Sequence, residues 1–397
     1  MSLSFDLECE QEMNNASPSV LVIGGGVAGS SCALSLARLG MEVHVAEKSE
    51  FPRDKACGCC IGPAGLAAID QLGLHEQTKS LSVPVNRWLG SFNARQVDLA
   101  IPAGIAIART VLDPLMLDAA RQAGASVALK CTASVRANSE TIGDHVVVDM
   151  MHNGSVETKC FDVVVIAAGL SFGGLDAILP WQQSPHGPFG AACRIRDPLS
   201  SIKPGTIYMA CDDDGYVGIV CLADGTVDVA GALRSGAQAA RLGSPLCRIK
   251  QIIDRSSFDL PDVLPLSGVI TTPMLRRTRK VGNGRVIAIG DTAGYVEPFT
   301  GEGMTWAMQS GIAAANLIAA IGDHSQTGDH SQLGDLSTLG DQWQSESSRL
   351  LGQQKLICKI VTNACRSGLM RSSIAKALGT FPSLASPLLK SLSRVPM

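Results

Sequence analysis

The chain has 397 residues, of which 46% are hydrophobic and 17% charged, and it contains 41 glycines. This composition excludes a disordered chain, and the length suits one large composite domain or two. The formal net charge of −3 gives no reason to expect a nucleic-acid partner. The 13 cysteines do not indicate a disulfide framework, because their number is odd and several lie within apolar runs. We find no secretory signal and no apolar stretch of about 18 residues, so we expect a cytoplasmic protein.

A strand–helix–strand unit follows a polar tail at residues 1–17. Residues 20–23 form a short apolar run that is typical of a buried parallel strand. Helical spacing of apolar residues then extends over 30–39 and stops at Gly40, a residue type that is common after helix ends. A second apolar strand covers 43–46. This order predicts a βαβ unit of ordinary length.

A glycine motif, Gly24-x-Gly26-x-x-Gly29, lies between that first strand and the helix. In this context Gly24 permits a tight turn, Gly26 lets the backbone approach a pyrophosphate, and Gly29 allows close packing of the helix on the sheet. The helix N-terminus adds free N–H groups and the positive end of a dipole, and Glu47 can accept hydrogen bonds from a ribose. The residues predicted to bind a dinucleotide here are Gly24, Gly26, Val27, Ala28, Gly29, Glu47 and Lys48.

Two later apolar strands are predicted at 161–169 and 285–291. Short alternating runs fill residues 181–280 between them and indicate an antiparallel sheet that forms a substrate layer. Residues 304–321, after the second of these strands, are typical of a long alanine-rich helix. The aromatic side chains that could line an apolar substrate pocket are Trp88, Trp181, Tyr208 and Tyr216.

A six-residue repeat begins at Gly322 and contributes one Gly-Asp pair per period. We interpret it as a solvated linker, because one carboxylate per repeat is a thin ligand supply for a metal-binding array. After Glu346 the chain carries no acid but eight basic residues between Arg349 and Arg394, interleaved with apolar ones. We interpret this segment as a helical cap with a solvated basic face; the alternative is peripheral contact with a membrane surface.

A second glycine-rich turn follows the later strand, which ends on Gly290-Asp291. With the first motif it resembles the FAD-binding fold of the p-hydroxybenzoate hydroxylase and geranylgeranyl reductase group, over roughly residues 19–325. In that group the aspartate that matches Asp291 binds the flavin ribityl chain, and the glycine-rich loop lies along the flavin ring. The resemblance implies FAD as the cofactor, with a helix N-terminus placed to stabilise the reduced anionic flavin. The loop residues are Pro298, Gly301, Glu302 and Gly303.

A third stretch, from Pro52 to Gly58, resembles the Pro-Arg-x-Lys-x-Cys-Gly segment of geranylgeranyl-reductase-like flavoproteins. In that group the segment runs past the flavin, and an Arg-x-x-x-Asp element that matches Arg109 and Asp113 follows. One departure is that Ala168-Gly169 replaces the Asp-Gly that usually follows the third strand, which weakens the case for a hydroxylase mechanism. The Trp-x-Trp-x-Ile-Pro element of halogenases is absent from the sequence. The resemblance adds to the cofactor site Arg53, Lys55, Cys57, Gly58, Arg109 and Gly169.

Cys57 is the predicted catalytic residue and lies in a cluster with Cys59 and Cys60. A thiolate beside the flavin could bond to it covalently, exchange electrons, or act as an acid to the substrate. Arg53 and Lys55 would lower the pKa of Cys57 and so increase the thiolate fraction. The alternative, which we favour for Cys59 and Cys60, is that small residues are needed where the backbone passes close to the ring. No second Cys or His pair lies at ligand spacing in the sequence, so no metal site is expected.

The sequence thus predicts an α/β protein with a Rossmann-like FAD-binding domain of p-hydroxybenzoate hydroxylase type, an inserted antiparallel β-sheet substrate domain and a C-terminal helical segment. The FAD-binding parts are predicted at 18–80, 108–178 and 279–321, the substrate parts at 81–107 and 179–278, the linker at 322–341, and the helical segment at 342–397.

We expect a reductase that acts on a small apolar substrate, such as a prenyl or polyketide compound, by hydride transfer from flavin N5. The proton would come from Cys57 or from water. Because there is no second Gly-x-Gly-x-x-Gly motif, NAD(P)H would bind only transiently to recharge the flavin. The alternatives are a flavin monooxygenase or halogenase that acts on an aromatic ring, and a non-catalytic escort protein that retains FAD. No motif indicates which molecule is the substrate, and none indicates an oligomeric state.

Overall fold

The computed structural model describes residues 18–92, 95–136, 145–171, 173–197, 201–258, 264–322 and 335–392. Within them a six-stranded sheet has the order β16-β17-β10-β1-β2-β6, and every neighbouring pair is parallel except β16 with β17. Its strands are β1 (Ser19–Ile23), β2 (Glu42–Glu47), β6 (Ser126–Leu129), β10 (Val163–Ile166), β16 (Gly282–Asn283) and β17 (Val286–Ala288). Strands β1 and β10 are almost wholly buried, which is why both appear in the sequence as continuous apolar runs.

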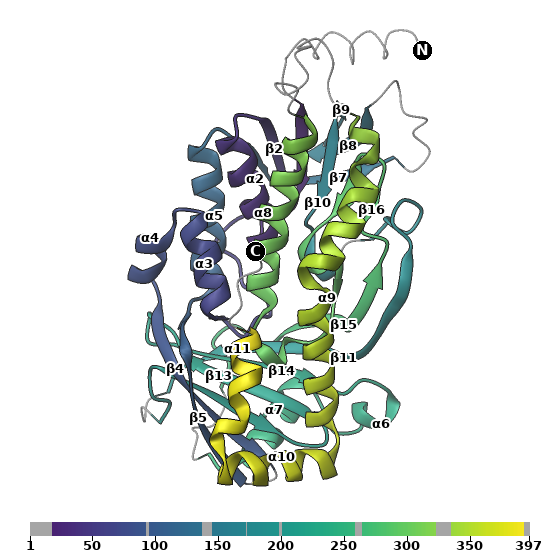
Figure 1. Ribbon diagram of the computed structural model, residues 1–397. Coiled ribbons are helices and arrows are strands. Elements are labelled where there is room, and N and C mark those ends of the chain that lie inside the picture. The colour runs from purple at the N-terminus through teal and green to yellow at the C-terminus, as the bar shows by residue number, and fades with distance from the viewer. Residues whose placement is uncertain are drawn as a thin grey trace, which may run out of the picture.

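Helices cover one face of this sheet (Figure 1), and they are α2 (Val27–Arg38), α3 (Pro63–Gln71), α5 (Arg109–Gln122) and α8 (Gly303–Gly322), with α4 (His75–Ser80) after α3. Helix α8 is long and apolar enough to cross a membrane, but 67% of that stretch is buried inside the protein, as in a core helix. It crosses α2 closely, because a Cβ on Gly311 would lie 2.5 Å from the carbonyl oxygen of Ala28. A larger residue at that crossing would push the two helices apart.

The other face of the parallel sheet carries a small antiparallel sheet made of β7 (Cys131–Val135), β8 (Val146–His152) and β9 (Ser155–Phe161). Its apolar side chains pack against Leu21 and Val164, which point away from the helices. The parallel sheet is therefore buried between a helical layer and a second sheet. The three strands of this second sheet were not predicted from the sequence.

A nine-stranded sheet has the order β18-β15-β11-β14-β13-β12-β4-β5-β3 and draws strands from both predicted substrate segments. Its pairs are antiparallel except β12 with β4, so the predicted antiparallel sheet contains one parallel pair. One face packs on α7 (Pro245–Asp254), with the short α6 (Ala237–Ala240) before it. The strands are β3 (Cys60–Ile61), β4 (Val83–Phe92), β5 (Arg95–Ala106), β11 (Trp181–Ile195), β12 (Thr206–Cys211), β13 (Gly215–Cys221), β14 (Val227–Leu233), β15 (Ile270–Arg279) and β18 (Gly294–Tyr295).

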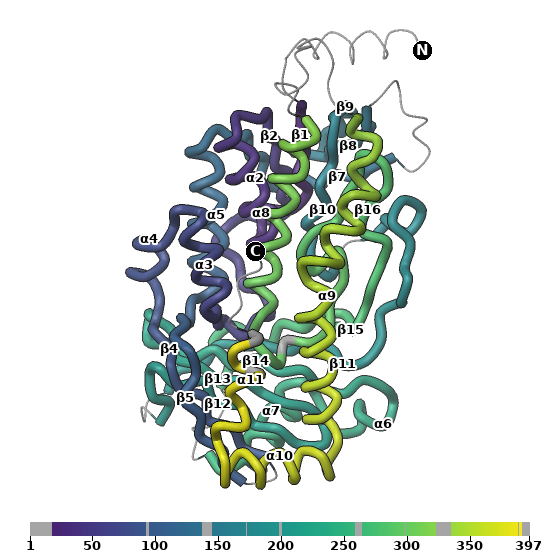
Figure 2. The backbone as a smooth tube through the Cα atoms, viewed as in Figure 1, coloured from purple at the N-terminus to yellow at the C-terminus, as the bar shows by residue number. Residues whose placement is uncertain are grey.

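Three C-terminal helices connect the two large sheets, and they are α9 (Leu339–Arg366), α10 (Gly368–Thr380) and α11 (Ser386–Leu392), with the 3-10 turn η5 (Pro382–Ala385) between the last two. Figure 2 shows α9 running from the level of the parallel sheet down to the nine-stranded sheet, where α10 and α11 lie. The indole Nε1 of Trp343 donates a hydrogen bond of 2.8 Å to the carbonyl oxygen of Ala288 and anchors the start of α9. Glu297 anchors its other end by an ion pair of 2.9 Å with Arg366.

The Gly-Asp repeat lies mostly outside the described residues, at 323–334. The last residues of the predicted linker are helical, since η4 (Leu336–Thr338) leads directly into α9. The Asp335 side chain accepts a hydrogen bond of 3.0 Å from the backbone N–H of Ser337 and caps this turn. The C-terminal helices therefore begin at Leu339 and not at residue 342.

Candidate functional site

A cavity of about 730 Å³ lies where the parallel sheet, the nine-stranded sheet and the C-terminal helices meet. It lies at the carboxyl ends of β1 and β10, the usual place for a ligand in an open α/β sheet. Gly24, Gly29 and Glu47 lie behind its wall, and Pro298 starts the adjoining turn η3 (Pro298–Thr300). The other predicted site residues all line the cavity, and they are Gly26, Val27, Ala28, Lys48, Arg53, Lys55, Cys57, Gly58, Arg109, Gly169, Asp291, Gly301, Glu302 and Gly303.

The three glycines of the first motif have different structural roles. Gly24 has a φ of +108°, and a Cβ there would lie 2.6 Å from the carbonyl oxygen of Ala167. A Cβ on Gly29 would lie 1.8 Å from the carbonyl oxygen of Gly24. The backbone itself therefore requires both of these glycines. Gly26 is different: it is the N-cap of α2, no described side chain caps the helix there, and the nearest atoms that a Cβ would meet belong to side chains, at 3.6 Å or more.

Positive charge gathers in front of Gly26. A Cβ on Gly26 would lie 3.6 Å from an Arg109 guanidinium nitrogen and 3.9 Å from one of Arg53. Arg109 is held by Asp113 through two buried hydrogen bonds of 2.6 and 2.8 Å. Burial works against the charge of Arg109, but Asp113 outweighs it and raises the pKa of Arg109. Free N–H groups at a helix start beside two guanidinium groups suit a pyrophosphate.

Two carboxylates border the cofactor end of the cavity. Glu47 accepts hydrogen bonds of 2.8 Å from the Gly25 N–H and 2.9 Å from the Ser49 N–H, so it holds the glycine loop in place. Its contact with a ribose stays a prediction. Asp291 lines the cavity, with the Lys55 ammonium 4.0 Å from its Oδ2. Its carboxylate can accept hydrogen bonds from the hydroxyls of a polyol chain.

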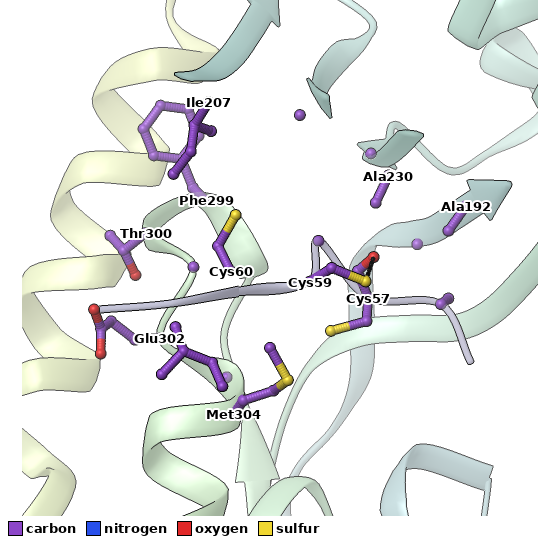
Figure 3. A pocket seen from close by; sticks show the side chains of 18 of the residues that line it. Cys57, Cys59, Cys60, Ala192, Ile207, Ala230, Phe299, Thr300, Glu302 and Met304 are labelled. Atoms are coloured by element: carbon purple, nitrogen blue, oxygen red, sulfur yellow. Dashed lines mark hydrogen bonds between the residues drawn. The ribbon is translucent and has the colours of Figure 1, made fainter. Parts of the chain in front are cut away.

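Cys57 and Cys59 lie next to one another in the cavity wall, whereas Cys60 lies apart from them on the side of Phe299 (Figure 3). The neighbouring Cys59 side chain lowers the pKa of Cys57 to about 6, against the effect of burial and with help from the charge of Arg109. The Cys59 thiol donates a hydrogen bond of 3.9 Å to the backbone carbonyl oxygen of Cys57. The Cys57 side chain and burial raise the pKa of Cys59 far above its ordinary range. At neutral pH Cys57 is therefore a thiolate and Cys59 a thiol. The depressed pKa agrees with the sequence prediction, but its main cause is Cys59.

Asp228 is a buried acid that the sequence analysis missed. It lies on β14, is 5% exposed, and hydrogen-bonds with Cys59. Its Oδ2 has no hydrogen-bond partner among the described residues. Burial, together with the charge of Cys57, raises the pKa of Asp228 far above its ordinary range, which favours the protonated carboxyl. The available signal was an acid in the middle of the apolar run Val227-Asp228-Val229, which places it inside a sheet.

Glu302 is a second acid at the cofactor end. It follows Gly301 in the glycine-rich loop, lines the cavity and is 6% exposed. Burial raises the pKa of Glu302 to about 7. A fraction of these carboxyls is therefore protonated at neutral pH, which gives the site a second group that can hold a proton.

The far half of the cavity is apolar and lies between the nine-stranded sheet and the C-terminal helices. Side chains from β4 and β5 form one wall, and they include Trp88, Phe92, Leu99 and Ile101. The C-terminal helices form the opposite wall with Ile360, Val361, Ala364, Ile374, Leu378, Leu384 and Leu389. The C-terminal segment, predicted as a helical cap, therefore also forms a wall of the site.

Two of the four predicted pocket aromatics lie elsewhere. Trp88 and Tyr216 line the cavity, and the ring of Tyr216 packs edge-to-face on Phe299 at 4.9 Å between centroids. Trp181 instead stacks with the Arg279 guanidinium at 3.7 Å. Tyr208 belongs to the core under α7, where its hydroxyl accepts a hydrogen bond of 3.1 Å from the Lys203 N–H. Whether an aromatic residue lines the cavity depends on its position along the strand and on the face of the sheet to which its side chain points. Residue type alone predicts neither.

The fold and the site are similar to those of FAD-dependent oxidoreductases with the p-hydroxybenzoate hydroxylase type of fold. Residues 17–184 match the family described as FAD binding domain. Menaquinone reductase of Mycobacterium tuberculosis is 27% identical over 339 residues, which cover 76% of each chain. Chloroplastic geranylgeranyl diphosphate reductase of Oryza sativa subsp. japonica is 26% identical over 333 residues, which cover 76% of this chain and 66% of that protein.

A solved structure shows the same fold at lower identity. p-Nitrophenol 4-monooxygenase PnpA from Pseudomonas putida DLL-E4 is similar with a TM-score of 0.74 and 16% identity, over 96% of this chain and 99% of that one. The predicted fold class and the predicted resemblance to the geranylgeranyl reductase and p-hydroxybenzoate hydroxylase group are confirmed. The residues present also fit FAD, because the open N-cap at Gly26 lies beside two arginines and Asp291 lines the same cavity.

Proposed function

We propose that the protein is an FAD-dependent reductase that saturates a carbon–carbon double bond of an apolar, prenyl-type substrate, with NAD(P)H as the reductant. The observation that carries this proposal is the cavity itself, in which a cofactor end with proton-holding groups opens into a long apolar half. The names of two relatives, menaquinone reductase and geranylgeranyl diphosphate reductase, support a reductase. Bound FAD would supply the hydride.

The residues of the chain would supply the proton. Saturating a double bond places a hydride on one carbon and a proton on its neighbour, so the site needs an acid that is protonated at neutral pH. The lowered pKa of Cys57 makes it a poor store of protons at neutral pH. Cys59 lines the cavity and can donate its proton to the substrate, and Asp228 can restore that proton. Glu302 is a separate donor from the other side of the loop.

Anaerobic turnover tests this function. The purified protein with bound FAD is mixed with NADH or NADPH and geranylgeraniol in the absence of oxygen, and the product is identified by mass spectrometry. We expect one nicotinamide nucleotide to be oxidised for each double bond saturated. Incorporation of molecular oxygen into an aromatic substrate would show a monooxygenase instead. A flavin that no nicotinamide nucleotide reduces, with or without substrate, would show a non-catalytic escort.

A further inference from the structure

The apolar half of the cavity reaches the surface between the C-terminal helices. On α10, Met370, Ile374, Leu378 and Phe381 recur at intervals of three and four residues and so share one face. Ile374 and Leu378 line the cavity, while Met370 and Phe381, at the two ends of the same face, are 52% and 61% exposed. The stripe therefore continues from the inside of the protein to the solvent.

Helix α9 and the turn η5 repeat this arrangement. Leu356, Ile360 and Ala364 lie four residues apart on α9, and the last two line the cavity. Ile360 is nevertheless 59% exposed, and Leu356 is 58% exposed. Leu384 of η5 both lines the cavity and is 58% exposed. We call the exposed set the apolar mouth, and it consists of Leu356, Ile360, Met370, Phe381 and Leu384, with Leu369 beside it at 86% exposed.

The charge around the apolar mouth has one sign on these helices. No acid occurs after Glu346 in the whole chain. Three exposed lysines stand next to mouth or cavity residues in the sequence, and they are Lys359, Lys376 and Lys390. Two arginines of this segment form ion pairs with acids of other elements. Arg366 pairs with Glu297 at 2.9 Å, and Arg371 pairs with Asp213 at 2.6 Å. The positive charge of the three lysines is therefore exposed to solvent.

We propose that the apolar mouth docks on an anionic lipid bilayer and that the substrate is a membrane lipid whose prenyl chain enters the cavity between α9, α10 and α11. Apolar side chains with exposed lysines beside them in the sequence match a hydrocarbon layer under negatively charged head groups. Because the apolar lining is continuous from mouth to cofactor end, a chain can move from bilayer to cavity without crossing water. This inference rests on the proposed reductase function for its substrate, whereas the docking itself does not.

A second copy of this chain is the competing occupant of the mouth. A two-fold contact through this face would bring the lysines of one copy against those of the other. Like charges across an interface are unfavourable, and these helices offer no carboxylate after Glu346 to relieve them. The charge therefore favours an anionic lipid surface over a second copy.

Vesicle binding tests the docking. Wild-type protein is sedimented with vesicles of phosphatidylcholine that contain phosphatidylglycerol, and with vesicles of phosphatidylcholine alone. We expect binding to the anionic vesicles that weakens with salt, and roughly a hundredfold loss of binding in the double variant Leu369→Asp, Phe381→Asp. Neither residue lines the cavity, so melting temperature and flavin content should not change. Val156→Asp, at a site 65% exposed on β9, is the matched control and should bind like wild type.

Two substrates separate the docking from the reaction. The double variant should reduce geraniol in solution as fast as wild type does, but reduce a geranylgeranyl lipid held in anionic vesicles at least roughly tenfold more slowly. If wild type reduces neither substrate, the proposed reductase function is refuted. The vesicle-binding experiment still tests the docking by itself. Equal vesicle binding by wild type and double variant would overturn the docking. The docking would also be overturned if wild type formed a dimer, the double variant did not, and neither protein bound vesicles.

Discussion

Cys59 holds a left-handed backbone conformation, with a φ of +53°, that few residues other than glycine adopt. This conformation places its thiol between the Cys57 thiolate and the Asp228 carboxyl. Non-glycine residues in this region are concentrated at functional sites, where the surrounding structure holds them. At the scale of single residues, Cys59 therefore links Cys57, which carries negative charge, to Asp228, which can hold a proton.

Replacing Cys59 by glycine should raise the pKa of Cys57. Glycine accepts the left-handed backbone, so the fold should be kept while the hydrogen bond is lost. The pKa of Cys57 should then move from about 6 towards the ordinary thiol value of 9.0. The ultraviolet absorbance of the thiolate, followed against pH, measures this shift. Cys60→Ala removes a neighbouring thiol that makes no such bond and should leave the midpoint unchanged; an unchanged midpoint in Cys59→Gly would refute the assignment.

Glu302 should make the protein less stable as the pH rises. Its pKa is about 7 in the folded protein against 4.5 when unperturbed, so the folded state binds the proton more tightly. The stability associated with the protonated form is complete below pH 4.5 and is lost through the interval up to about 7, by about 3 kcal/mol. Glu302→Gln should therefore gain stability over wild type at pH 8 and none at pH 4. Urea unfolding at both pH values measures this, and Glu76→Gln, at an exposed site, is the control.

At the scale of elements, the glycine loop before α2 contains one residue that is important for FAD binding, Gly26, and another that is important for folding, Gly29. Gly26→Ala introduces no contact shorter than 3.6 Å, whereas Gly29→Ala drives a Cβ to 1.8 Å from a backbone oxygen. We expect Gly26→Ala to keep its melting temperature but to bind FAD at least roughly tenfold more weakly, because the methyl group occupies the approach to α2. Gly29→Ala should lose about 1–3 kcal/mol of stability through overpacking. Thermal unfolding and flavin fluorescence measure the two effects, and equal behaviour of the two variants would contradict these roles.

Local sequence motifs predicted the cofactor end of the cavity. They did not predict the role of Asp228 or the wall formed by the C-terminal helices. Spacing located the turn from Gly24 to Gly29, because it is a strand end and a helix start with a fixed local geometry. The family resemblance added Asp291, and the helix predicted at 304–321 is α8. The role of Asp228 depends on which thiol the fold brings beside it, and the sequence spacing carries no such information. The C-terminal helices show the same difficulty, since an amphipathic stripe has the same pattern whether it covers a core or a cavity.

At the scale of the whole molecule, one cavity is shared by three parts of the fold. The parallel sheet supplies the cofactor end, the nine-stranded sheet supplies one apolar wall, and the C-terminal helices supply the other. Glu297 ties these parts together, because it is 1% exposed and pairs with Arg276 of β15 and Arg366 of α9. The position of the mouth between α9, α10 and α11 thus depends on the same contacts that close the site.

The most direct test of the reductase assignment is a single turnover in deuterium oxide without oxygen. The protein with bound FAD is reduced by one equivalent of NADPH, excess nucleotide is removed, and geranylgeraniol is added. We expect the flavin absorbance to return as the alkene is consumed, and the product to carry solvent deuterium at both carbons of the saturated bond. One deuterium would come from Cys59, Asp228 or Glu302, and the other from the reduced flavin, whose N5 hydrogen exchanges with solvent. A flavin that stays reduced with the alkene and is reoxidised only when oxygen is admitted, with labelled oxygen appearing in an aromatic product, would contradict the account.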